Sequence, residues 1–258
     1  MIEIIMENKI SLVDIILPNY NKAKFLDEAI KSILNQSFSN FKLHIIDDFS
    51  NDNSLEIIKK FSDSRIKLTT LKENYGVYYC RNLGLKFSNS KYIAFIDADD
   101  YWDKDKLENQ IKFMEKFNYG FTYTDYIPFT IEKNNKKFKK KIVVNKEFSF
   151  NEFIHNTSIA MSTVIVQKSL LKNIKFEKLE VCEDYLFKCQ ILRKHKAVKC
   201  EDALMYYCIS KNSMQSNKLR SLFWVWKINK NFNKLSILKN FKSILLISFN
   251  SLKKYGLK

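Results

Sequence analysis

The sequence predicts an α/β fold: a mostly parallel sheet flanked by helices. Through the first hundred residues, apolar, β-branched runs of strand length alternate with stretches in which apolar residues recur at helical spacing. Each apolar run of this alternation ends in polar or acidic residues. Because successive parallel strands need a crossover between them, this βαβαβαβ order indicates a sheet covered by helices.

The elements of this unit follow from their composition. Residues 11–17 form an apolar run that Pro18 and the polar residues after it end. The further strands are predicted at residues 41–46 and 66–71 and in a run ending at Asp97. Helices are predicted from apolar residues at helical spacing across 25–34, through Leu55, Ile58 and Phe61, and across 77–87.

The second half of the chain carries weaker signals. Residues 163–166 read as a strand, and helical periodicity follows Glu183 and Asp184. The basic run 136–141 lies between two apolar segments and is interpreted as the solvated tip of a hairpin. Trp102 has two open interpretations, a core residue or a wall of a ligand pocket.

Composition excludes several classes of protein. The 258 residues are 46% apolar, so the chain has enough hydrophobic residues for a globular core. The five cysteines form no C-x-x-C pair, which indicates reduced thiols in the cytoplasm and no zinc site. No secretion signal is evident, and no apolar run is long enough to span a bilayer.

The net charge of +16 is concentrated near the C-terminus. The 56 residues after Asp202 contain eleven Lys or Arg and no Asp or Glu, so residues 1–202 carry 33 basic and 28 acidic side chains. Aromatic and aliphatic residues recur at helical spacing within this basic segment. We expect a basic amphipathic helical extension that contacts an anionic membrane surface. Packing of these helices on the rest of the protein, with the lysines in water, is the alternative.

Polar clusters at four successive strand ends predict one ligand site, because ligands bind parallel sheets beyond the carboxyl ends of the strands. These clusters are residues 19–21, Asp47 with Asp48, Asn74, and residues 97–100. The carboxylates of Asp97, Asp99 and Asp100 suit a hard cation that bridges to a diphosphate. Taken alone, such acids also serve as helix caps and turn formers.

Glycine motifs for phosphate binding are absent. The chain has four glycines and contains neither G-x-G-x-x-G nor G-x-x-x-x-G-K-[ST]. This excludes the usual dinucleotide-binding dehydrogenases and P-loop NTPases, and leaves a metal and cationic side chains to neutralise a diphosphate.

Several motifs together resemble the family 2 glycosyltransferases of the GT-A fold, over roughly residues 10–210. They are Pro-Asn-Tyr-Asn at 18–21, Asp-Asp-Phe-Ser at 47–50, Asn-Tyr-Gly at 74–76, Arg-Asn-Leu-Gly at 81–84, Asp-Ala-Asp-Asp at 97–100 and the pair Glu183-Asp184. The likeness is to the type that builds bacterial surface polysaccharides, such as teichuronic acid. The chain departs from the family pattern at Phe49, where many members carry Gly, and at Lys211, where many carry Arg or His before Ser213.

The resemblance implies roles for individual residues. Tyr20 would stack on the nucleotide base, and Asp48 would accept a hydrogen bond from it. Arg81 would lie near the diphosphate, and Asp99 with Asp97 would hold Mn²⁺ or Mg²⁺. Asp184, beside Glu183, would be the general base. The complete implied nucleotide-sugar site is Pro18, Tyr20, Asn21, Asp48, Asn74, Arg81, Asp97, Ala98 and Asp99.

We therefore expect a metal-dependent inverting glycosyltransferase. It would move a sugar from a nucleotide sugar, expected to be a UDP-sugar, to a glycan or lipid-linked acceptor of lipopolysaccharide, capsule or a related polymer. Residues 1–210 would form the catalytic domain, with a nucleotide-sugar half (10–100) and an acceptor half (101–210), and residues 211–258 the tail. The cytoplasmic face of the inner membrane is the expected location. A catalytically silent membrane-associated scaffold is the alternative, and a nucleic-acid-binding protein is disfavoured because acids at the strand ends would repel phosphates.

Overall fold

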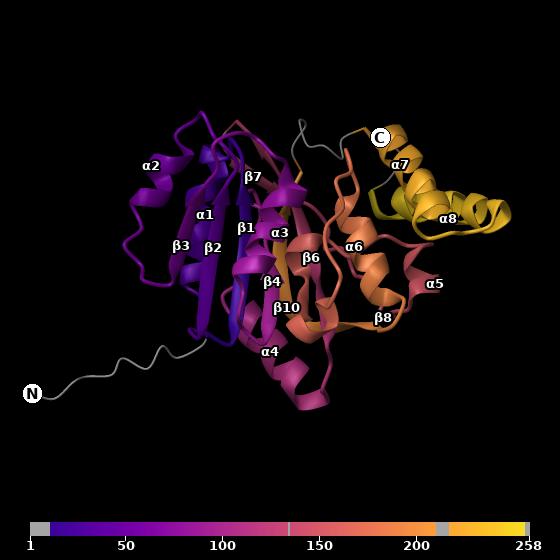
Figure 1. Ribbon diagram of the computed structural model, residues 1–258, viewed down its shortest axis with the longest axis horizontal. Coiled ribbons are helices and arrows are strands. Elements are labelled where there is room, and N and C mark those ends of the chain that lie inside the picture. Colours follow the sequence, from indigo (N-terminus) through magenta and orange to yellow (C-terminus); the bar gives the residue numbers. More distant parts are fainter. Residues whose placement is uncertain (1–10, 134, 210–216, 256–258) are drawn as a thin grey trace, which may run out of the picture.

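The computed structural model describes residues 11–133, 135–209 and 217–255 (Figure 1). Its strands are β1 (Val13–Asn19), β2 (Phe41–Asp47), β3 (Ile66–Thr70), β4 (Tyr92–Phe95), β5 (Tyr101–Trp102), β6 (Phe121–Glu132), β7 (Asn135–Phe138), β8 (Glu147–Phe148), β9 (Ile165–Gln167) and β10 (Ala197–Cys208). Its α-helices are α1 (Ala23–Leu34), α2 (Ser54–Lys59), α3 (Val77–Phe87), α4 (Lys106–Phe117), α5 (Phe150–Phe153), α6 (Glu183–Leu192), α7 (Lys218–Asn231) and α8 (Ile237–Tyr255). Two short 3₁₀ helices are η1 (Met161–Thr163) and η2 (Lys168–Leu171).

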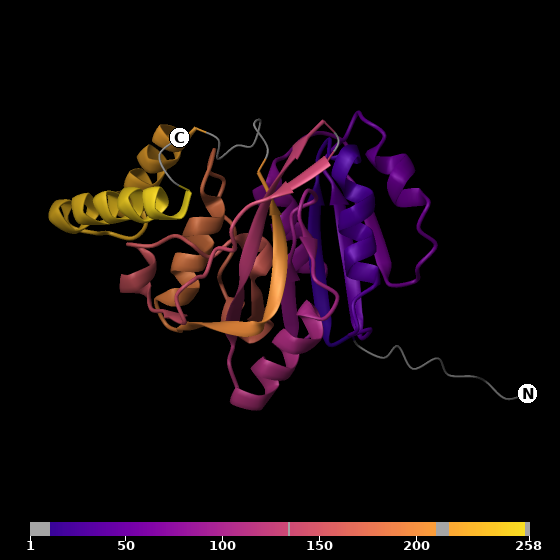
Figure 2. The same cartoon turned by 180° about the vertical axis from the view of Figure 1, so that it is seen from behind.

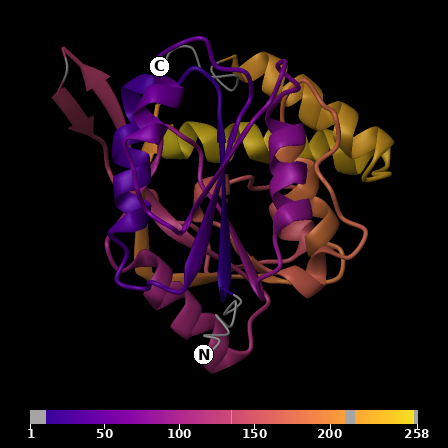
Figure 3. The ribbon, with the colours of Figure 1, turned by 60° about the vertical axis from the view of Figure 1, so that its left-hand side comes forward.

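One sheet, in the order β3-β2-β1-β4-β9-β6-β10-β5, organises the described residues, with β7 beside β6 and β8 beside β10. The first four strands are parallel, as the sequence predicts. All seven residues of β1 are buried, so both faces of this strand need cover. Figure 3 shows α1 and α3 on opposite sides of these strands. The α/β fold class is therefore confirmed.

The second half of the sheet is mixed. Strand β9 pairs antiparallel with both β4 and β6, and β6 pairs parallel with β10. The strand predicted at 163–166 begins later, because residues 161–163 form the 3₁₀ turn η1. The interpretation of residues 136–141 as a hairpin tip is wrong, since Lys136 and Lys137 belong to β7 and pair with β6. Lysines suit such an edge strand because their charge discourages further strand pairing.

The C-terminal helices are present and pack against the rest of the protein. Figures 1 and 2 show α7 and α8 beside α6, at the opposite end of the molecule from α2 and β3. The Tyr185 hydroxyl donates to Asn229 Oδ1 at 2.7 Å, and the Ser243 hydroxyl donates to the Ile154 carbonyl. One face of these C-terminal helices thus packs on the rest of the protein, which was the alternative to membrane contact. Among the described residues, no helix is long and apolar enough to cross a bilayer.

Candidate active site

The loops after β1 and β2 are joined into one rigid edge. Asn19 donates from Nδ2 to Asp47 Oδ1 (2.6 Å) and to Ser50 Oγ (3.1 Å), and the Asn21 backbone N–H donates to the same hydroxyl (3.0 Å). Pro18 is a buried residue of β1 and immediately precedes Asn19, the last residue of that strand. Tyr20 is 45% exposed between the two asparagines. An aromatic ring is thereby presented at the carboxyl edge of the sheet, and its stacking on a nucleotide base stays a prediction.

Asp48 turns inward and holds the loop that precedes α3. Its two carboxylate oxygens accept the backbone N–H groups of Tyr75 and Gly76, both at 2.8 Å. Asn74 donates to the Asp48 carbonyl, and Gly76 has a φ of +91°, a backbone conformation that favours glycine. Asp48 is only 3% exposed. This geometry gives Asp48 a structural task, and its contact with a nucleobase stays a prediction.

Lys22 pairs with Asp99 and was not foreseen from the sequence. Its Nζ lies 2.5 Å from Asp99 Oδ2, and the two side chains are 31% and 16% exposed. Burial raises the pKa of Asp99, and the ammonium of Lys22 opposes that rise. The only sequence signal was position, because Lys22 directly follows the Pro-Asn-Tyr-Asn motif. A cation therefore lies beside the carboxylate that the resemblance assigns to the metal.

Arg81 joins the two predicted halves of the site. It donates from one terminal nitrogen to Asp97 Oδ1 (2.6 Å) and from the other to Glu183 Oε1 (2.7 Å). The Arg81 side chain is 4% exposed and Glu183 is 7% exposed, whereas Asp97 is 35% exposed. Burial disfavours the charged guanidinium, but the two carboxylates outweigh it and raise the pKa of Arg81. Arg81, the cation that the resemblance places near the diphosphate, thus binds two carboxylates and fixes the positions of both.

Asp184 lies in the first turn of α6, where an acid also interacts favourably with the helix dipole. Lys188, one turn later, donates from Nζ to Asp184 Oδ2 (2.8 Å) and to the Ile159 carbonyl (2.7 Å). Burial opposes ionisation of Asp184, but Lys188 prevails and lowers the pKa. The Asp184 side chain is 15% exposed. The Asp184 carboxylate is therefore ionised, fixed and within reach of solvent, and its role as the general base stays a prediction.

Other residues around Asp99 support the backbone. Asp100 is 1% exposed and accepts the Ser162 hydroxyl (2.5 Å) and the Cys208 backbone N–H (2.8 Å). Burial, with the neighbouring acids, raises the pKa of Asp100 well above its usual value. Ala98 and Trp102 are both 3% exposed, and the Trp102 indole donates to the Ser162 carbonyl. Trp102 is therefore a core residue and not a pocket wall.

The residues present fit a divalent cation whose remaining ligands come from a diphosphate. The described part of the chain contains no group of three or more His, Cys, Asp or Glu side chains arranged to hold a metal. Asp97 and Asp99 supply two carboxylates from one turn, which the Asp100 backbone N–H closes by donating to the Asp97 carbonyl at 3.0 Å. Mg²⁺ commonly uses one or two carboxylates together with substrate phosphates. When bound, such a cation would neutralise charge that develops on a departing diphosphate.

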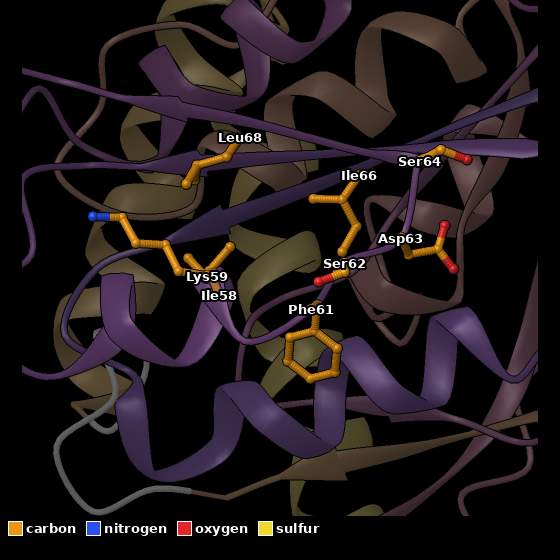
Figure 4. Close-up of a pocket in the computed structure, with 8 residues that line it drawn as sticks. All are labelled: Ile58, Lys59, Phe61, Ser62, Asp63, Ser64, Ile66 and Leu68. Carbon is orange, nitrogen blue, oxygen red and sulfur yellow. The ribbon is translucent and has the colours of Figure 1, made fainter.

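A separate hollow of about 360 Å³ lies between α2 and the start of β3 (Figure 4). Its lining runs from Ile58 to Leu68 and includes Ser62, Asp63 and Ser64, which precede β3. It is therefore next to the amino end of β3, away from the carboxyl ends where the polar clusters converge. None of the predicted site residues lines this hollow, and Lys211 and Ser213 lie outside the described residues.

Several known proteins resemble this chain in sequence. The sequence profile described as "Glycosyl transferase family 2" matches residues 14–193. The Escherichia coli UDP-Glc:alpha-D-GlcNAc-diphosphoundecaprenol beta-1,3-glucosyltransferase WfgD is 35% identical over 219 residues, which are 84% of this chain and 85% of that protein. The putative teichuronic acid biosynthesis glycosyltransferase TuaG of Bacillus subtilis is 28% identical over 96% of this chain and 99% of its own length.

Solved structures show the same fold. The S. aureus TarS fragment 1–349, in complex with UDP-GlcNAc, has a TM-score of 0.69 and 20% sequence identity, and the likeness covers 93% of this chain and 72% of that fragment. At this identity the likeness bears on the fold, which is of the GT-A type predicted from the motifs. With a profile match over residues 14–193 and a relative 35% identical over most of both chains, this protein belongs to glycosyl transferase family 2 and is a glycosyltransferase.

Proposed function

We propose that this enzyme transfers a sugar, with inversion, from a UDP-sugar to a hydroxyl of a lipid-linked or glycan acceptor in the synthesis of a bacterial surface polysaccharide, such as lipopolysaccharide or capsule. One observation carries the proposal: Arg81 bridges Asp97, at the diphosphate side, to Glu183, the neighbour of Asp184. The proposed diphosphate site and the proposed general base are therefore connected through one network of charged side chains.

The chemistry assigns each side of this network a task. Asp184 is ionised and takes the proton of the acceptor hydroxyl as it attacks the anomeric carbon. Lys188 fixes the orientation of that carboxylate. Asp97 and Asp99 hold the Mn²⁺ or Mg²⁺ that accompanies the donor diphosphate, and Tyr20 stacks on its base. Attack from the face opposite the leaving group, without a covalent intermediate, gives inversion.

The names of the relatives support this choice of donor and acceptor. WfgD is described as using UDP-Glc and a GlcNAc-diphosphoundecaprenol acceptor, and the TarS fragment is described in complex with UDP-GlcNAc. Both names contain a UDP-sugar, and one of them contains a lipid diphosphate. A UDP-sugar and a lipid-linked sugar are therefore the first substrates to test.

The test is release of UDP from a panel of UDP-sugars, with Mn²⁺ or with EDTA and with a synthetic lipid-diphosphate sugar as acceptor. Wild type is compared with Asp99→Asn and Asp184→Asn. The matched control is Asp63→Asn, because Asp63 forms an ion pair with Arg65 at the hollow beside β3, away from the proposed site. We expect Mn²⁺-dependent release from one donor, lost in the first two variants and kept in the control. Donor binding without turnover for any acceptor would favour a silent scaffold, and the absence of metal-dependent donor binding would reject the proposal.

We also propose that α8 lies on the cytoplasmic face of an anionic membrane, where a lipid-linked acceptor would be found. Along this helix, large apolar side chains three or four residues apart face outward: Leu238, Phe241, Leu245, Phe249 and Leu252 are 83%, 58%, 55%, 64% and 45% exposed. The opposite face, with Asn240, Ser243 and Ile247, is buried against the protein. The helix thus has an apolar stripe for which the described residues provide no cover.

The basic residues of α8 favour an anionic lipid surface as the partner of this apolar stripe. Lys239, Lys242 and Lys253 border it, and α8 contains no acidic residue. Apolar side chains that enter the interface, beside lysines that meet anionic headgroups, are the usual composition of interfacial helices.

Co-sedimentation with vesicles tests this second proposal. We expect binding to vesicles with 30% phosphatidylglycerol, weaker binding to pure phosphatidylcholine, and loss of binding in Phe241→Ser/Phe249→Ser. The matched control is Phe117→Ser, an exposed phenylalanine on α4. Equal binding of the double variant and wild type would reject the stripe as the membrane contact.

A further inference from the structure

Phe49 combines two features that rarely occur together. Its backbone has a φ of +64°, in the left-handed region, which a bulky side chain adopts at a cost in free energy. Its side chain is also 55% exposed, so the ring gains little from burial. Glycine would remove the strain, and a polar residue would remove the exposed apolar surface. A residue that is unfavourable in both respects suggests a task beyond folding.

The surrounding hydrogen bonds hold Phe49 in this conformation. On its N-terminal side, the Asp48 backbone N–H donates to the Asn19 carbonyl (2.8 Å). On its C-terminal side, Ser50 donates from its backbone N–H and its hydroxyl to the two carboxylate oxygens of Asp47 (3.0 and 2.6 Å). The strained residue therefore lies between two anchored neighbours, and its backbone is fixed.

Hydrogen bonds between neighbouring residues also bring the backbone of Phe49 beside that of Tyr20. Asn19 and Asn21, on either side of Tyr20, bond to Asp48 and Ser50, on either side of Phe49. The two loops thus present one exposed aromatic residue each, 45% and 55% exposed, at the carboxyl edge of the sheet.

A second aromatic group lies next to this pair. Tyr75 donates its backbone N–H to Asp48, and its ring stacks on that of Tyr79, with 4.5 Å between the ring centroids. Both rings are partly exposed. Aromatic side chains therefore line the edge on the side where the nucleotide is proposed to bind. Nucleobases stack on such side chains whichever base is present, because every base has a flat aromatic face.

We propose that Phe49 is the second aromatic wall of the nucleobase site, so that the base of the donor lies between the rings of Phe49 and Tyr20. This rests on the proposed function, since it assumes a nucleotide donor. The backbone strain at Phe49 is then offset by affinity for the base. Because stacking acts on the base alone, Phe49 contributes nothing to binding of the diphosphate.

Titration calorimetry with Mg²⁺ tests the proposal, with UDP and inorganic pyrophosphate as ligands. Phe49→Gly should bind UDP about tenfold more weakly than wild type, the loss expected for one stacking partner, and bind pyrophosphate equally well. Phe49→Tyr should bind UDP like wild type. Lys234→Gly is the matched control, because it changes an exposed residue with a φ of +54° to glycine far from the site and should leave UDP binding unchanged.

The outcomes separate this inference from the proposed function. If wild type binds UDP and Phe49→Gly binds it within twofold as tightly, the ring is not a wall of the base site. If Phe49→Gly loses UDP and pyrophosphate equally, its effect is on the loop and the inference is also rejected. If wild type binds no UDP, the proposed function itself fails. Phe49→Asn, whose short side chain tolerates a positive φ, repeats the comparison if the glycine variant is unstable.

Discussion

Replacing Arg81 with Met should strongly destabilise the fold, because it leaves a buried acid without a partner. Glu183 is 7% exposed and accepts a charge-assisted hydrogen bond of 2.7 Å from a guanidinium that is 4% exposed. Removing one partner of a buried ion pair costs about 3–5 kcal/mol, which corresponds to a melting temperature about 6–20 °C lower for a chain of this size. The contact with Asp97 adds little, since that carboxylate is 35% exposed.

Urea unfolding of wild type and Arg81→Met measures this cost, and Arg220→Met is the matched control. Arg220 makes a 2.8 Å contact with Glu180, but both side chains are at least half exposed, so the control should lose at most about 1 kcal/mol. Arg81→Met/Glu183→Gln should recover part of the loss, because the second change removes the unpaired charge. A loss below about 1 kcal/mol in Arg81→Met, or no recovery in the double variant, would refute the assignment of Arg81 as a buried bridge.

Three further outcomes are expected. Lys188→Met should lower kcat and shift the acidic limb of the pH–rate profile to higher pH, because Lys188 holds the pKa of Asp184 below its usual value; an unshifted limb would contradict the positioning role. Burial opposes ionisation of Asp14, but hydrogen bonds from the His44 imidazole and two backbone N–H groups lower its pKa. The ionised carboxylate therefore stabilises the fold above about pH 4, and this contribution is lost as the pH falls below that value. Urea unfolding at pH 7 and pH 3 should therefore show a smaller pH dependence for Asp14→Asn than for wild type. Gly84→Ala should cost about 1–3 kcal/mol in the same assay, because a Cβ there would lie 2.6 Å from the Ile16 side chain; an unchanged midpoint would show that α3 can move away from β1.

The sequence was most informative where the signal is local. The alternation of apolar runs and helical periods predicted the four parallel strands, and the helix predicted at 77–87 has the same bounds as α3. Where the signal was weak, errors followed. The basic run 136–141 carries no periodicity, and its assignment to a hairpin tip failed because strand β7 is held by pairing with β6 and not by its own composition.

Candidate site residues could be found because catalytic and binding groups follow strand ends, and strand ends are visible in sequence. Their partners were less visible. Lys188 lies one helical turn after Asp184, so helix periodicity contains a signal for that pair. Lys22 lies 77 residues from Asp99, and its position directly after the Pro-Asn-Tyr-Asn motif is the only local signal for this contact.

By itself, the sequence determined the α/β class, the family motifs, the acidic strand ends and the basic tail, because composition, periodicity and motif spacing are properties of short segments. Tertiary structure decided what those groups touch. It placed Arg81 between two acids, one of them 102 residues away, turned Asp48 toward the loop before α3, and packed one face of the tail against the protein while leaving the other exposed. Such pairings depend on how distant segments fold together, and a carboxylate that binds a metal and one that holds a loop look the same in a sequence.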